Sequence, residues 1–114
     1  MATIEDREDM NDVSLTGKVH GKAEVMMTPS EGLILTFTLT VSKIVKRRTN
    51  PSLKLSTFKV VLFNELAERH ERNVVDGQCV LVKGELDETA YFGGGTTNHE
   101  FRVVGRFVKI LGGA

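Results

Sequence analysis

The chain has 114 residues, 40% of them hydrophobic, and a formal net charge of zero at pH 7. This length suits one domain with a single modest core. The apolar runs are short and the N-terminus is acidic, which excludes a membrane-spanning helix, a secretory signal and an acid-poor transit peptide. A cytoplasmic protein is therefore expected.

Charge is distributed unevenly along the sequence. Residues 1–12 hold five acids and one base, so residues 13–114 keep 14 bases against 10 acids, a net charge of +4. We divide the chain into a flexible acidic N-terminal segment (residues 1–11), one folded domain (residues 12–112) and a C-terminal end without an acidic tail (residues 113–114). The folded part is predicted to be mildly basic.

Three strands are predicted in the first half of the chain. Apolar residues alternate with polar ones around Gly17 and again over residues 33–42, the period expected of strands with one buried face. Residues 43–54 lose this pattern and contain Asn50-Pro51. We expect them to form the tip of a long hairpin that leads into a third strand at residues 55–63.

A short helix is predicted next. Asn64 is a suitable N-cap, and Asp76-Gly77 ends the helical pattern. One apolar stripe of this helix consists of Leu66, His70 and Val74.

Two further strands complete the prediction. The fourth lies at residues 79–86, with an extension to Phe92 as an alternative, and the fifth at residues 99–111, after a glycine-rich loop at residues 93–98. Three strands, a helix and two strands, with Gly17 where a barrel must bend, predict an all-β, five-stranded OB-fold barrel.

No residues suggest catalysis. The three histidines are scattered, and no spacing resembles a metal cage, a phosphate loop or a nucleophile motif. Asp87 and Glu88 are adjacent on a strand, hence on opposite faces. Cys79 has no partner for a disulfide and is predicted to be buried and inert. We expect neither an enzyme nor a bound cofactor or metal.

Residues 56–68 (STFKVVLFNELAE) resemble the signature strand and helix start of bacterial single-stranded DNA-binding proteins. The resemblance continues at residues 11–19 (NDVSLTGKV), 37–41 (FTLTV), 77–86 (GQCVLVKGEL) and 107–112 (FVKILG). It implies an OB-fold protein that binds single-stranded DNA without sequence preference in DNA replication, recombination or repair. It also implies a nucleoid-associated homotetramer or dimer that contacts replication or repair proteins and no membrane.

Single-strand binding needs cations that follow the phosphates and flat side chains on which bases stack. A basic hairpin would supply the cations, although such a run can also be a solvated loop. The resemblance places a base at Lys59 and stacking aromatics at Phe63 and Tyr91. Phe63 could instead belong to the core, and Phe92 could be core or platform. The candidate DNA-binding residues are Lys43, Lys46, Arg47, Arg48, Lys54, Lys59, Phe63, Tyr91 and Phe92.

The sequence also departs from the resembled family. Two of its stacking tryptophans correspond to Val45 and Thr57, and Asp87 and Glu88 stand where it often has bases. The family's acidic tail is absent after Gly113-Ala114, so a truncated chain and a tail-less relative both remain open. An alternative function is therefore a tail-less OB-fold interaction module, similar to primosomal proteins, that docks a replication or recombination partner and binds DNA weakly.

Overall fold

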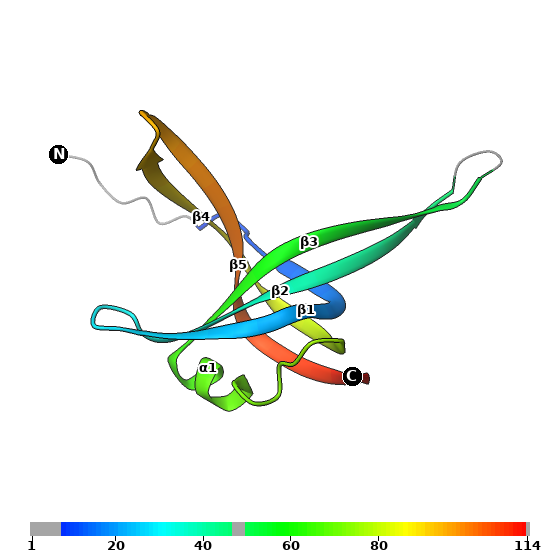
Figure 1. The fold of residues 1–114 in the computed structure, drawn as a ribbon, viewed down its shortest axis with the longest axis horizontal. Helices are drawn as coiled ribbons and strands as arrows, with labels where there is room; N and C mark the ends of the chain where they lie inside the picture. Colours follow the sequence, from blue (N-terminus) through cyan, green and yellow to red (C-terminus); the bar gives the residue numbers. More distant parts are fainter. Residues whose placement is uncertain (1–7, 47–49, 114) are drawn as a thin grey trace.

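The computed structural model describes residues 8–46 and 50–113. Its elements, in chain order, are β1 (Val13–Thr28), β2 (Gly32–Val45), β3 (Ser52–Phe63), α1 (Asn64–His70), β4 (Gln78–Gly93) and β5 (Thr96–Gly113). The five strands close into a barrel in the order β1-β2-β3-β5-β4 (Figure 1), with β3 and β5 parallel and the other neighbours antiparallel. This arrangement confirms the predicted OB-fold architecture.

The core lies inside the barrel and follows the period of two in the sequence. On β2, Leu35, Phe37 and Leu39 are buried, while the threonines between them are only partly covered. Val60 and Leu62 of β3 are fully buried beside them. Because full burial of one such side chain contributes about 1.5 to 3 kcal/mol, these inward residues fix which face of each strand points out.

Gly17 is the point at which β1 changes partner. Residues before it pair with β4, and Lys18 pairs with both Cys79 of β4 and Thr40 of β2. A Cβ atom at Gly17 would overlap the carbonyl oxygen of Thr40. The close approach of the two backbones therefore requires glycine, as expected for the bend of a barrel.

The helix differs from its prediction. It ends at His70, and its buried residues are Ala67 and His70. Phe63, not Asn64, occupies the N-cap position, and no side chain caps it. Asn64 instead accepts a hydrogen bond from the backbone N–H of Leu33, 3.3 Å away, so its side chain secures β2 rather than the helix.

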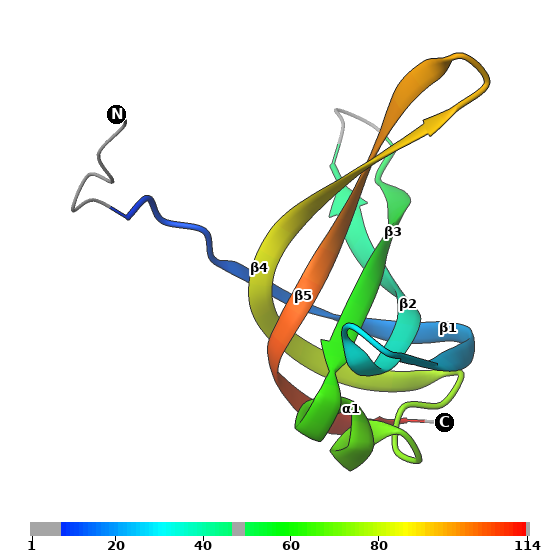
Figure 2. The same cartoon turned by 90° about the vertical axis from the view of Figure 1, so that its left-hand side faces the viewer.

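Two hairpins project from the barrel as long arms (Figures 1 and 2). We call them the β2–β3 arm, which runs outward from the Thr40 and Thr57 pair, and the β4–β5 arm, which runs outward from the Asp87 and Arg102 pair. The predicted strands were too short: the first reaches Thr28, and pairing continues to Val45 opposite Ser52 and to Gly93 opposite Thr96. The fourth strand thus takes the longer of its two predicted forms, and the predicted loop at residues 93–98 is mostly paired strand.

One smaller expectation is wrong. Cys79 is only half-buried, not buried as predicted, because it lies on the side of β4 turned away from the core. Among the described residues, the structure contains no helix long and apolar enough to span a membrane.

Candidate nucleic-acid interface

The side of the strands turned away from the core forms one continuous surface, which we call the outer face. On β3 it carries Lys59, Val61 and Phe63, which alternate with Val60 and Leu62 of the core, and of these three Val61 is buried. The members contributed by β4 and β5 are Asp87, Thr89, Tyr91, Asn98, Glu100 and Arg102. Strand alternation, together with ion and ring contacts between β3 and β5, thus brings the two arms onto one surface.

Tyr91 and Phe92 are both exposed, at 56% and 76%, but on opposite faces of the β4–β5 arm. Tyr91 lies directly opposite Asn98 on the outer face, and Phe92 lies opposite Thr97 on the other. Phe92 is therefore not a core residue. An exposed tyrosine ring on the outer face has the geometry that base stacking requires.

The basic residues are divided between the two faces. Lys43 and Lys54 lie directly opposite one another in the β2–β3 arm, on the face opposite to Lys59. Lys46 is exposed beyond the end of β2. Arg47 and Arg48 fall outside the residues that the structure describes. No described acid forms an ion pair with Lys43 or Lys54, so both charges are available to an anion.

Cations on the β4–β5 side, by contrast, are paired. Lys59 lies 3.4 Å from the carboxylate of Glu100, and both side chains are about half exposed. Arg102 Nε donates a 2.9 Å hydrogen bond to Asp87, and His99 contacts Glu88. Of the two acids that the sequence suggested would weaken a cationic track, Asp87 is thus paired with an arginine, and Glu88 contacts a histidine.

Phe63 is half-buried on the outer face, and the guanidinium of Arg102 lies 5.7 Å from the centre of its ring. This separation is within the range of a cation–π contact. Phe63 is thus neither a fully buried core residue nor an open platform. Arg102 was not identified from the sequence, because its contact depends on how β3 and β5 are aligned.

Exposed aliphatic residues extend the outer face along the β2–β3 arm. Ile44 lies directly opposite Leu53, and Leu55 precedes Thr57 on the same face. Their exposed fractions are 64%, 65% and 59% respectively. Ile44 and Leu53 were missed from the sequence because residues 43–54 were predicted to be a loop, where alternation was not considered. They provide apolar contact area on the outer face of this arm.

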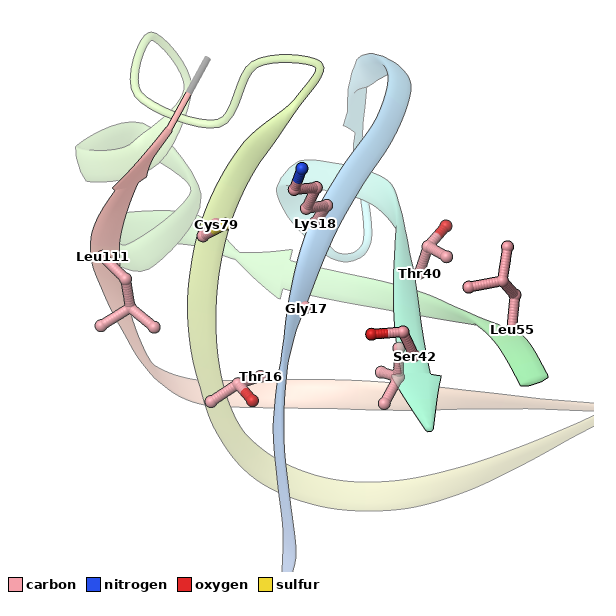
Figure 3. A pocket seen from close by; sticks show the side chains of 9 residues that line it. Thr16, Gly17, Lys18, Thr40, Ser42, Leu55, Cys79 and Leu111 are labelled. Atoms are coloured by element: carbon pink, nitrogen blue, oxygen red, sulfur yellow. The ribbon is translucent and has the colours of Figure 1, made fainter. Parts of the chain in front are cut away.

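The outer face is hollowed at two places. A hollow of about 290 Å³ lies over β2 and is flanked by Lys22 and Lys59. A cleft of about 520 Å³ opens where β1 separates from β2. Figure 3 shows Lys18 of β1 on one side of this cleft and Ser42 of β2 and Leu55 of β3 on the other. Both hollows combine cationic, hydroxyl and apolar groups, and Glu24 adds an acid to the smaller one.

Within residues 8–46 and 50–113, no three His, Cys, Asp or Glu side chains are grouped as a metal site would need. Burial, and to a lesser extent the neighbouring Arg69, lowers the pKa of His70 from 6.5, so this ring is neutral at pH 7. It is the last residue of α1, on the buried side of the helix, and adds no positive charge to the outer face.

Comparison with known proteins gives concordant results. Residues 10–111 match the single-strand binding protein family. A single-stranded DNA-binding protein of Treponema pallidum (strain Nichols) is 24% identical over 104 residues, which cover 91% of this chain and 59% of the relative. The chain thus spans about three fifths of the length of that relative.

Solved structures share the fold. The chain of a Plasmodium falciparum SSB complex with ssDNA has a TM-score of 0.83 at 16% identity, covering 94% of this chain and 99% of that one. A small single-stranded DNA-binding protein from Streptomyces coelicolor has a TM-score of 0.70 at 17% identity, with coverage of 87% and 92%. A deletion mutant of the Thermus aquaticus protein has a TM-score of 0.79 at 23% identity, covering 90% of this chain and 50% of that one.

Proposed function

The chain belongs to the single-strand binding protein family, and on this premise we propose that it binds single-stranded DNA without sequence preference. The observation that carries the proposal is the outer face, where the exposed ring of Tyr91 shares one surface with Lys59 and the Phe63–Arg102 pair. Stacking surfaces and cations on one face are what a single strand requires. Family membership also agrees with the expectation that the protein is not an enzyme.

Tyr91 provides a direct test, because the chain has one tyrosine and no tryptophan. Its intrinsic fluorescence reports on the proposed interface alone. We expect titration with oligo-dT to quench this emission, and the affinity to fall as salt rises, since phosphate contacts release counterions. Fluorescence that stays constant while a labelled oligonucleotide binds would place the DNA elsewhere on the molecule.

The DNA-binding surface proposed here retains all of the candidates from the sequence. The outer-face members Lys59, Phe63 and Tyr91 would contact bases and nearby phosphates. Lys43, Lys46 and Lys54 of the β2–β3 arm would contact phosphates as the strand passes around the arm. Arg47 and Arg48, which lie outside the described residues, are proposed from the sequence to do the same, and Phe92 would offer its ring to a base. Roles in DNA replication, recombination or repair in the cytoplasm follow from such binding, with residues 12–112 as the binding domain.

We also propose that the protein self-associates, as a homotetramer or a dimer. Support comes from apolar side chains on the inner side of the strands that the core leaves exposed, notably Phe58 (36%), Leu86 (46%) and Phe101 (56%). Burial of such a patch between copies would remove it from water. Light scattering after size-exclusion chromatography should give a mass of about four or two times 12.6 kDa.

A second candidate is the interaction module with weak DNA affinity. It is favoured by the ion pair that engages Lys59 and by the exposed Ile44 and Leu53, which suit a protein partner as well as a nucleobase. Binding of oligo-dT at two salt concentrations distinguishes the candidates. Weak binding that hardly responds to salt would favour the module.

A further inference from the structure

Arg102 occupies a fixed position on the outer face. It lies directly opposite Asp87 in the β4–β5 ladder, and its Nε donates a 2.9 Å hydrogen bond to that carboxylate. Its guanidinium carbon lies 5.7 Å from the centre of the Phe63 ring. Only a quarter of the side chain is exposed. The guanidinium is thus held along its edge by a charge and on one side by a ring, which fixes a planar group at the surface.

The position of Arg102 determines whether a nucleobase can stack on Phe63 or on the guanidinium. A base that stacks directly on that side of Phe63 must first displace Arg102, and so break both a charge-assisted hydrogen bond and a cation–π contact. A base that stacks on Arg102 itself breaks neither. Guanidinium planes are known to support stacked bases as aromatic rings do. Because Asp87 already balances the charge, Arg102 is also poorly suited to capture a phosphate.

We propose that Arg102 is a nucleobase-stacking platform, backed by Phe63 and oriented by Asp87. It would supply a flat surface that a chain without tryptophan lacks. The proposal rests on the single-stranded DNA binding proposed above and adds a subsite for an unpaired base. Tyr91 lies four residues from Asp87 on the same face of β4, so the two platforms are about 13 Å apart along the strand.

The test compares Arg102→Lys with the parent on two ligands, a dT oligomer and an abasic oligomer of equal length, both at low salt. Lysine keeps the charge but has no plane. We expect the dT affinity to fall about 5- to 150-fold, while the abasic affinity changes less than twofold and the salt dependence stays the same. Arg106→Lys is the matched control, because this arginine of β5 is also ion-paired, to Asp12, and should bind both oligomers as the parent does.

The alternatives give different results. Equal losses on both oligomers in Arg102→Ala, restored by Arg102→Lys, would make the residue a phosphate ligand and overturn the proposal. Unchanged binding of both oligomers by Arg102→Lys would leave it a structural role only. If that variant does not fold, as judged by thermal melting, the double variant Arg102→Met/Asp87→Asn removes both charges of the pair, makes the same comparison and carries the same expectations. A parent protein that binds neither oligomer would refute the proposed function itself, before any variant is compared.

Discussion

The two arms are built from the same element, an antiparallel strand pair that extends beyond the barrel, yet their charged side chains are arranged in opposite ways. On the β4–β5 arm, the three described acids at positions 87, 88 and 100 each have a basic partner. The described part of the β2–β3 arm contains no acid, and Lys43 lies directly opposite Lys54.

This difference indicates that the two arms contribute differently to the proposed DNA binding. Like charges directly opposite one another destabilise a strand pair by roughly 0.2 to 1 kcal/mol, and an anion bound between them would remove that cost. In the other arm, the Arg102–Asp87 and His99–Glu88 contacts join β5 to β4 and leave the exposed rings of the arm free for contact. We infer that the β2–β3 arm supplies most of the electrostatic attraction and the β4–β5 arm most of the stacking.

The largest effect is expected from Tyr91→Ala. Loss of the ring should weaken oligo-dT binding by about 1 to 3 kcal/mol, while the melting temperature stays nearly unchanged because the side chain is exposed. Fluorescence anisotropy of a labelled oligomer measures the first and thermal melting the second. Tyr91→Phe keeps the ring and should bind almost as the parent does.

Phe92→Ala is the matched change on the other face of the same arm, and we expect a smaller loss from it. A loss at position 92 that equals or exceeds that at Tyr91 would show that the strand crosses the opposite face of the arm, and the outer face would no longer define the interface.

The next largest effect is expected from Lys43 and Lys54, which lie directly opposite one another in the β2–β3 arm. The double variant Lys43→Gln/Lys54→Gln should reduce the slope of log affinity against log salt by about 1.4, since each lost phosphate contact removes about 0.7. At 0.1 M salt this corresponds to a loss of about 1 to 2 kcal/mol. Stability in urea should rise slightly because the repulsion is removed. Binding and stability would thus change in opposite directions.

Lys83 and Lys109 serve as the control for that experiment. They are exposed on β4 and β5, outside the arms. Their double glutamine variant should leave the slope closer to that of the parent. If both pairs lower the slope equally, attraction comes from the whole surface, and the contrast between the arms fails.

Thr57→Trp tests whether the two arms can be made more alike. Thr57 is exposed on the outer face, two residues before Lys59, so an indole there would give the β2–β3 arm a stacking platform of its own. We expect tighter oligo-dT binding by about 1 kcal/mol, the lower end for one stacked base, since ordering the new side chain costs entropy. Thr57→Leu adds apolar area without a flat ring, and should gain less. Equal gains would point to apolar burial rather than stacking.

Much of the barrel can be read from the sequence because burial imposes a period. The alternation around Leu35, Phe37 and Leu39 identifies β2 and its inner face, and Gly17 marks the bend of β1. The arms extend beyond the core, so nothing enforces apolar alternation there, and residues 43–54 were interpreted as a loop. If the predicted strands had been continued through residues 43–54, the alternation of side chains would have placed Lys43 and Lys54 on the inner side.

The pairings across strands could not be predicted in the same way. Asp87 meets Arg102 only in one alignment of β4 with β5, and a register shift between Lys83 and Gly84 sets that alignment. The sequence identified Tyr91 and Phe63 as stacking candidates, but not the cation over Phe63 or the acid beside Lys59. Charges on neighbouring strands therefore decide which of the predicted cations are free.

The smallest effect is expected from breaking the ion pair between Lys59 and Glu100. Glu100 lies 3.4 Å from Lys59 and competes with any phosphate for it. Glu100→Gln should release this lysine, tighten oligo-dT binding by roughly 0.5 to 1 kcal/mol and steepen the salt dependence by about 0.7. Stability should hardly change, because exposed ion pairs contribute little.

Glu88→Gln removes the same charge from the other face of the arm, and its oligo-dT affinity should rise less. If both variants tighten binding equally, net charge alone is responsible. If Glu100→Gln binds oligo-dT no more tightly than the parent, Lys59 makes no phosphate contact. The electrostatic attraction would then come from the β2–β3 arm without a contribution from the cation beside the β4–β5 arm.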